Sequence, residues 1–262
     1  MTAARIFLVL LGKEWKESFR RRRAPILVLV FALFAILSPI LARYMPDILA
    51  ALMAGQAPGS GPVITMPEPT VRDSFDQLAK NLTQNCIFLL LLLSVGTVVE
   101  EKTRGYAVLV LTRGVPRSVF LLAKYAALLL VVLLCLVAAF GLFAYYNYLL
   151  FDTWPDDHLL QGCAAVFLHS AFLLAATILA STLARSVPAA AAGTVGGYLV
   201  LSAMSMLPIL RDGSPLAWPS VLTSILLGQR HLADFPWMLL TSVVGTLAFL
   251  GIAIRLFQRQ EL

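Results

Sequence analysis

Residues 85–149 read NCIFLLLLLSVGTVVEEKTRGYAVLVLTRGVPRSVFLLAKYAALLLVVLLCLVAAFGLFAYYNYL. This stretch contains two apolar runs, 85–99 and 118–149, and a link, 100–117, that carries most of its charge. Long apolar runs bounded by charge or proline are typical of membrane-spanning helices, which need about 20 mostly apolar residues. We therefore expect two spans that are joined by a short charged hairpin on one side of a membrane.

The whole chain extends this pattern. Of its 262 residues, 60% are hydrophobic and 13% are charged, with a mean hydropathy of +0.86, whereas soluble domains carry about 25% charged residues. This composition excludes a soluble globular protein and indicates an all-α polytopic membrane protein with one transmembrane domain, 1–262. The expected spans are about 24–45, 85–99, 118–149, 160–184, 187–210 and 235–255. Too little chain remains for a fused nucleotide-binding domain.

The charges between the spans indicate the orientation. Fifteen of the twenty lysines and arginines fall on the side of the hairpin: Arg5, Lys13, Lys16, Arg20, Arg21, Arg22, Arg23, Lys102, Arg104, Arg113, Arg117, Lys124, Arg185, Arg255 and Arg259. The positive-inside rule makes that side cytoplasmic. We therefore expect a multi-pass plasma-membrane protein, in a bacterium an inner-membrane protein, with both termini in the cytoplasm.

Three segments outside the spans have patterns of their own. Residues 4–22 form an amphipathic pattern with an apolar stripe on one face, which predicts an N-terminal elbow helix at the inner interface. Residues 46–84 contain five prolines and a Gly-Ser-Gly patch, so we expect an outer loop with an irregular middle, in which 73–84 is a candidate short helix that leads into span two. The apolar stretch 218–227 is about ten residues long, which is typical of a re-entrant helix before the last span.

The hairpin 100–117 has a distinctive order of residues. An acidic pair, Glu100 and Glu101, is followed by Gly105, by the six apolar residues 106–111, and then by Gly114 and Pro116. Glycine and proline break helices, and six residues cannot span a membrane. The pattern predicts a short helix that lies against the inner membrane face. An ordinary amphipathic connector remains an alternative reading of the residues alone.

This arrangement resembles the ABC-2 type permeases, the membrane subunits of type V ABC exporters. Their pattern has a lysine-glutamate pair in an elbow helix, here Lys13 and Glu14 beside Trp15, and then an acidic cluster and glycine after span two. A short apolar helix, a Pro-Arg turn and a lysine early in span three follow, here Pro116, Arg117 and Lys124. Tyr106 departs from the pattern, because a threonine commonly follows the glycine in that family.

The resemblance implies a function and partners. The chain would be the permease subunit of an exporter, without catalytic residues of its own, and the hairpin would be the coupling helix that docks on the ATPase. The residues that the resemblance assigns to coupling are Glu100, Glu101, Arg104, Gly105, Tyr106, Leu109, Arg113, Pro116 and Arg117. The implied partners are two ATPase subunits, which bind ATP and Mg²⁺, and a second permease chain that is identical or related. We expect no nucleic-acid partner.

The resemblance also implies a pathway. Spans two and five face the dimer axis in such exporters, so the candidate lining residues are Asn85, Phe88, Ser94, Thr97, Thr194, Tyr198, Ser202 and Met206. His169 is the one ionisable residue near the middle of a span, where it is either functional or satisfied by a neighbouring helix. The mostly apolar set suits a hydrophobic or amphipathic substrate.

Two other classes stay open. The chain lacks a G-x-x-x-x-G-K-[ST] phosphate loop, so an ATPase-independent channel or transporter is one alternative. The other is a CAAX-type intramembrane protease, because EEKTR at 100–104 is similar to its E-E-x-x-x-R motif, although one residue shorter. Cys86, Cys135 and Cys163 show no metal-ligand spacing, so we expect no metal site.

Overall fold

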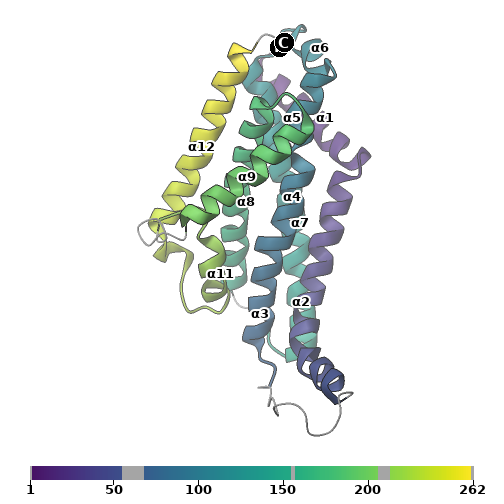
Figure 1. Cartoon of the computed structure of the whole chain (residues 1–262), viewed down its shortest axis with the longest axis vertical. Helices are drawn as coiled ribbons and strands as arrows, with labels where there is room; N and C mark the ends of the chain where they lie inside the picture. The colour runs from purple at the N-terminus through teal and green to yellow at the C-terminus, as the bar shows by residue number, and fades with distance from the viewer. Residues whose placement is uncertain (1, 55–67, 155–156, 206–212, 261–262) are drawn as a thin grey trace.

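The computed structural model describes residues 2–54, 68–154, 157–205 and 213–260, and in this part every regular element is a helix (Figure 1). The α-helices are α1 (Ala3–Arg20), α2 (Arg23–Ala54), α3 (Val71–Lys80), α4 (Ile87–Ser94), α5 (Gly96–Thr103), α6 (Tyr106–Leu111), α7 (Arg117–Phe151), α8 (His158–Leu183), α9 (Val187–Ser205), α11 (Trp218–Leu226) and α12 (Pro236–Arg259). A π-helix, η1 (Asn81–Cys86), joins α3 to α4, and a 3-10 turn, η2 (Leu232–Asp234), precedes α12.

Six helical segments among the described residues are long and apolar enough to cross a membrane. They are Arg23–Leu49, Val71–Thr103, Arg117–Phe151, His158–Leu183, Val187–Met204 and Pro236–Arg259. The chain is therefore an all-α protein with six candidate spans, as the hydropathy pattern predicts. The segment 206–210, expected as the end of span five, lies outside the described residues.

The outer ends of spans one and two differ from the expected boundaries. The expected loop begins at residue 46, but α2 continues through Pro39 and Pro46 to Ala54. A proline removes only one helical hydrogen bond, and neighbouring helices and local adjustments can compensate for it in membrane helices. Likewise, the helical segment of span two begins at Val71 rather than 85, and Asp73 accepts hydrogen bonds from the backbone and hydroxyl of Thr70 at 2.9 and 2.7 Å. The expected loop 46–84 is thus mostly helical among its described residues.

Span two is a segmented column of α3, η1, α4 and α5. At its π-helix, the buried Asn81 donates from Nδ2 to Ser38 Oγ of α2 at 3.0 Å, and Asn85 Nδ2 donates to Asn81 Oδ1 at 3.1 Å. Polar side chains between membrane helices bond across the interface because they find no water there. The π-helix therefore holds spans one and two together by a polar chain.

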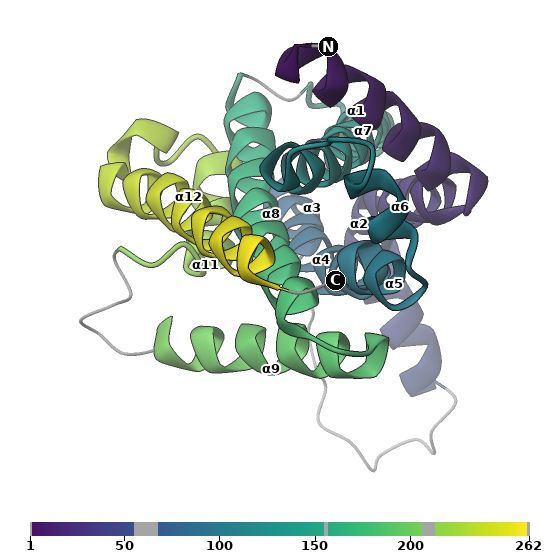
Figure 2. The same ribbon diagram turned by 90° about the horizontal axis from the view of Figure 1, so that it is seen from above.

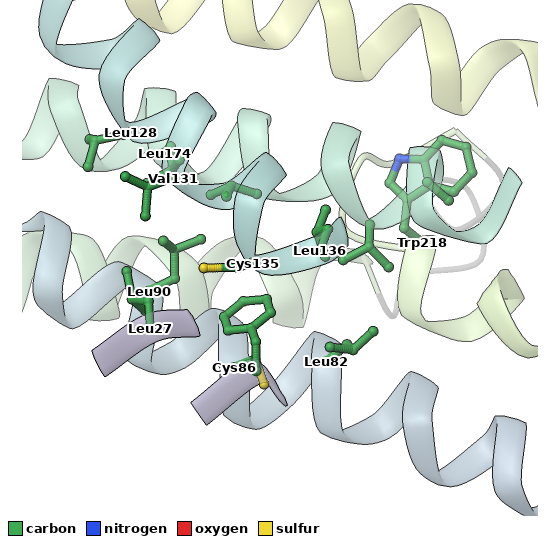
Figure 3. Packing of buried hydrophobic residues seen from close by; sticks show 14 of the residues in the cluster. Leu27, Leu82, Cys86, Leu90, Leu128, Val131, Cys135, Leu136, Leu174 and Trp218 are labelled. Carbon is green, nitrogen blue, oxygen red and sulfur yellow. The ribbon is translucent and has the colours of Figure 1, made fainter. Parts of the chain in front are cut away.

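The core lies along α7 and α8: α1 and α2 pack on α7, while α9, α11 and α12 pack on α8 (Figure 2). Its largest cluster joins side chains from α2, η1, α4, α7, α8 and α11, and Figure 3 shows part of it. Cys86 and Cys135 are buried free thiols within this cluster, and Trp218 of α11 is 1% exposed. Trp218 Nε1 donates to Ser242 Oγ of α12 at 2.9 Å, so α11 is fixed inside the bundle by both packing and a hydrogen bond.

The hairpin lies at the same end of the bundle as α1 and the end of α12 (Figure 1). The φ angles of Gly105 and Gly114, on either side of α6, are +75° and +77°. Side chains with a Cβ rarely adopt such angles, so these two glycines permit the sharp turns that lay α6 across the helix ends. A short helix thus stands where the sequence predicts one. Its contact with a partner, the interfacial position of α1 and a re-entrant position of α11 stay predictions.

Candidate functional site

Helix α1 presents a charged face to the bundle. Lys13, Glu14, Glu17 and Arg21 follow one another at spacings of one, three and four residues, which places them along one side of a helix. Glu14 is 8% exposed, whereas the apolar Leu8 and Val9 are 64% and 61% exposed. Trp15 lies beside this face and contacts Phe19 in a tilted arrangement, with 5.0 Å between ring centroids. Helix α1 therefore contacts the bundle largely through charge.

A buried lysine binds this face to span two. Lys124 of α7 is 2% exposed, and its Nζ lies 3.0 Å from Glu14 Oε2 and 3.0 Å from Glu101 Oε1 of α5. Lys13 Nζ completes the network at 3.1 Å from Glu14 Oε1 and 3.0 Å from Glu101 Oε1. Buried charges are tolerated when each has an opposite partner. Four charged groups from α1, α5 and α7 meet that condition together.

Glu100, the other hairpin carboxylate, is bound by the connection between α1 and α2. Arg21 Nη1 and Arg23 Nη2 lie 2.6 and 2.9 Å from its two oxygens. The carboxylate folds back over Gly96, where a Cβ would collide with it. The absence of a side chain at Gly96 therefore leaves room for the Glu100 carboxylate in this position.

The network also sets the charge state of its most accessible lysine. Burial would lower the pKa of Lys13, but the carboxylates of Glu14 and Glu101 outweigh burial and hold that pKa above its ordinary value. Oxygens of Glu14, Glu17 and Glu101 lie within 4.8 Å of one another, close enough to bind a metal ion. However, the ammonium groups of Lys13 and Lys124 already lie against these oxygens. The cluster is an ion-pair network with its own cations.

The hairpin is also tied to the ends of two other spans. Arg117 Nη1 donates at 2.8 Å to the carbonyls of Phe257, Gln258 and Gln260 at the end of α12. Lys102 Nζ donates to the carbonyl of Thr182, near the end of α8, at 2.9 Å. Cations stabilise the carbonyl end of a helix because its last four carbonyls have no partner within the helix. The flanks of α6 are thus bound to α1, α2, α7, α8 and α12.

The middle of the hairpin, in contrast, faces outward. Tyr106 is 51% exposed and Leu109 is 63% exposed, while Arg104 and Arg113 at the two turns are also exposed. Of the nine residues expected to couple to a partner, these four and Pro116 are exposed. Glu101 and Arg117 instead use their charge inside the chain, and Glu100 pairs with Arg21 and Arg23.

The expected pathway residues fall at separate places. Asn85, Phe88 and Tyr198 line a cavity of about 550 Å³ among α2, span two and α9. Thr194 and Tyr198 line another, of about 480 Å³, between α8 and α9. Ser94 and Thr97 line a small cavity of about 30 Å³ beside the charge network. Ser202 lies on α9, and Met206 lies outside the described residues. The structure does bring spans two and five together, since Val95 and Val99 pack on Ala190.

His169 has a partner from the chain itself. It is 1% exposed, and its Nδ1 lies 2.9 Å from the carbonyl oxygen of Pro215, just before α11. A carbonyl only accepts, so Nδ1 carries the proton and donates. The bond fixes the segment before α11 to α8, which is the structural role weighed for this residue.

A protease site would need histidines beside the acidic pair. In the described structure His169 pairs with Pro215, and the rings of His158 and His231 lie near each other, 5.3 Å between centroids, beside a different cavity from the one that Glu100 and Glu101 line. Glu100 and Glu101 are bound by arginine and lysine. This arrangement does not favour the CAAX-type alternative.

Sequence reasoning missed Glu17, Arg21 and Arg23 as members of the network. The spacing of charges along 13–21 was a possible signal, because it places acids and bases on one helical face. That face was expected to be solvated. Only the tertiary packing of α1 shows that Glu14 is buried and that its neighbours on this face pair with Glu100 and Glu101.

These features define a multi-pass α-helical membrane protein whose first helix is tied by buried charges to the hairpin between spans two and three. The chain belongs to a family described as a protein of unknown function, DUF2705, whose model matches residues 67–261. It is similar to the uncharacterized transmembrane protein YxlG of Bacillus subtilis (strain 168). The two are 24% identical over 258 residues, which cover 98% of this chain and 99% of that protein.

Proposed function

We propose that this chain is the permease subunit of an ATP-binding cassette exporter of the ABC-2 type. It moves a hydrophobic or amphipathic substrate, and separate ATPase subunits hydrolyse the ATP with Mg²⁺. The active assembly has two permease chains, identical or related, and two ATPase subunits. The hairpin lies on the cytoplasmic side.

The observation that carries this proposal is that α6 exposes apolar side chains while the residues on both sides of it are bound to the bundle. Tyr106 and Leu109 of α6 present an aromatic ring and an aliphatic side chain outside the bundle. Such side chains are typical anchors of protein interfaces when a partner pocket receives them. Exposed arginines at positions 104 and 113 flank them and supply a polar rim.

The contacts on both sides of α6 explain how a movement of α6 would be transmitted to the membrane-spanning helices. Glu101 links the hairpin to α1 and α7 through Lys13 and Lys124. On the other flank, Arg117 holds the end of α12. A rigid element joined to several helix ends turns the closure of two ATPases into a rocking motion of those helices. The buried charges make the joint stiff, because separating any pair leaves a charge without a partner.

The substrate class is supported by the cavities between the spans. The two larger cavities beside α9 are lined mainly by apolar side chains, and their polar exceptions are Gln84, Asn85, Thr194 and Tyr198. Ligand pockets commonly combine an apolar lining with a few polar groups that orient the ligand. This lining suits an amphipathic molecule better than a bare ion.

Copurification tests the proposal. A tagged chain, solubilised from its native membrane, should carry an ATPase that has a G-x-x-x-x-G-K-[ST] phosphate loop. Leu109→Asp should reduce the recovered ATPase by more than tenfold, because burying an unpaired carboxylate in an interface is unfavourable. Leu160→Asp, a similarly exposed leucine at the opposite end of the bundle, serves as the matched control and should retain the ATPase.

Two outcomes would contradict the proposal. The first is an active chain that transports without ATP and without any ATPase partner, which would favour the channel or transporter class. The second is equal loss of ATPase with both aspartate variants. In that case the effect would come from general misfolding, and α6 would not be the contact.

A further inference from the structure

A groove between α8 and α9 has the properties of a ligand site. Its volume is about 480 Å³, within the range of about 300–1,000 Å³ that small-molecule pockets occupy. On α9 it is lined by Gly193, Thr194, Gly197 and Leu201, which share one face of the helix. Leucines and alanines of α8 form the other wall.

Thr194 is the exceptional residue in this groove. It is 7% exposed, yet its hydroxyl has no hydrogen-bond partner in the part of the chain that the structure describes. Other buried threonines in the spans bond back to their own helix: Thr177 donates to Leu173 O at 2.9 Å and Thr182 to Ile178 O at 2.8 Å. An unpaired buried hydroxyl is costly, so a partner from a bound molecule would stabilise this position.

The dimensions of the groove indicate its occupant. Its α8 wall runs from Leu173 to Leu183, the last residue of the helix. Ten residues rise about 15 Å, which is half of a hydrocarbon core about 30 Å thick. The groove therefore has the length of one leaflet and begins at the end of the span.

We propose that this groove binds the acyl chain of a membrane lipid from the leaflet on the hairpin side, and that the Thr194 side chain turns its covered hydroxyl into the groove to donate a hydrogen bond to an ester carbonyl of the lipid. The chain would lie along the alanines and leucines of α8. The groove is one of the two cavities that support the proposed substrate class, so its place in transport rests on the proposed function, but lipid binding in it requires neither an ATPase nor transport.

A helix from a second copy of the protein fits this groove less well. A Cβ built on Gly193 would lie only 3.7 Å from Ala180 Cβ, so α8 and α9 nearly touch at that point. A helix with side chains is about 10–12 Å wide, so it would have to lie over both α8 and α9 and not within the groove. An extended hydrocarbon chain is much narrower.

Photolabelling tests the site. The purified chain in detergent is mixed with a trace of phosphatidylcholine that carries a diazirine on one acyl chain, irradiated, and mapped by mass spectrometry. Peptides within 173–201 should be labelled, and excess unlabelled phosphatidylcholine should compete. Gly197→Leu should abolish this competable label, because the new side chain fills the groove. Gly196→Leu is the matched control, since Gly196 does not line the groove and a Cβ there meets nothing within 4 Å.

A second variant distinguishes the effect of the Thr194 hydrogen bond from the effect of filling the groove. Thr194→Val keeps the shape and removes the hydroxyl, so it should weaken competable labelling by about twofold to tenfold, the effect of one hydrogen bond. Three results would overturn the proposal: label that excess lipid does not displace, equal loss in Gly196→Leu and Gly197→Leu, or no change in Gly197→Leu. A disulfide between two Gly197→Cys chains without label at 173–201 would instead assign the groove to a second copy.

Discussion

The ammonium group of Lys124 lies 3.0 Å from the carboxylate of Glu101, and both side chains are buried between α5 and α7. Glu101 begins the hairpin that the sequence assigns to contact with a partner. Its Oε1 instead pairs with Lys13 and Lys124 of its own bundle. The hairpin is therefore bound to the bundle at its flanks, while α6 and the two turns beside it carry exposed side chains.

Replacing Lys124 tests how much this ion pair contributes to the stability of the protein. Lys124→Met leaves Glu14 and Glu101 with Lys13 alone, and breaking a buried pair on one side commonly costs about 3–5 kcal/mol. Thermal unfolding in detergent should show a clear loss of stability. Lys16→Met, an exposed lysine on α1, is the control and should change the unfolding temperature little. Equal effects of the two variants would contradict a buried network.

A double substitution tests whether the loss comes from charge imbalance. Glu101→Gln combined with Lys124→Met removes one charge of each sign and leaves Lys13 beside Glu14. Residues in direct contact show interaction energies, so the double variant should be more stable than the sum of the two single losses allows. Strict additivity in this cycle would mean that the two side chains do not interact.

Gly96 provides a second test, which concerns the ion pairs of Glu100 with Arg21 and Arg23. Gly96→Ala puts a Cβ where the Glu100 carboxylate lies, so that carboxylate must leave Arg21 or Arg23. Alanine otherwise stabilises a helix interior by about 0.5–1 kcal/mol relative to glycine. Gly141→Ala in α7, where a Cβ meets nothing within 4 Å, should show that gain, and Gly96→Ala should not. A similar gain at both positions would contradict the described path of Glu100.

His169 should behave as a structural residue. His169→Phe removes the donor to the Pro215 carbonyl and should destabilise the protein by about 1–3 kcal/mol, the cost of an unsatisfied buried acceptor. His169→Asn supplies an amide donor on a shorter side chain and should recover part of the loss. Limited proteolysis within 213–217 reports the release of this segment. If transport, once assayed, falls in both variants while stability is unchanged, the histidine is functional.

Orientation is open to a direct test by labelling. In a variant without the three native cysteines, a cysteine at Tyr106 should react with a membrane-impermeant thiol reagent only from the cytoplasmic side. A cysteine at Thr70, before α3, should react only from outside. Both positions are exposed in the structure. Labelling of position 70 from the cytoplasm alone would reverse the topology.

The six spans could be predicted because each is a long apolar run, and hydropathy depends on composition alone. The short helix 106–111 was predictable from Gly105 and Gly114, since each break has a local cause. The outer ends of spans one and two were not. Pro46 lies within α2, and the polar start of α3 at Val71 has a low hydropathy although it is helical.

Hydropathy and helix-breaking residues do not predict which charges from distant parts of the sequence form pairs. The sequence places Glu14 and Lys13 on a charged face, but spacing along one helix does not tell which other helix covers that face. Lys124 was identified only as part of a family pattern, and its contacts with Glu14 and Glu101 depend on tertiary packing. For the same reason the unpaired hydroxyl of Thr194 gave no signal, because Thr177 and Thr182 have the same type of side chain in similar apolar surroundings.

The proposal that α6 docks on an ATPase is tested most directly by crosslinking from its exposed leucine. A photoreactive reagent attached to a cysteine at Leu109 is activated in native membranes, and the crosslinked protein is identified by mass spectrometry. The account predicts an ATP-binding subunit that contains a G-x-x-x-x-G-K-[ST] loop, and no such product from a cysteine at Leu160. Crosslinks from position 109 to lipid or to unrelated proteins alone, in membranes where the chain is active, would contradict it.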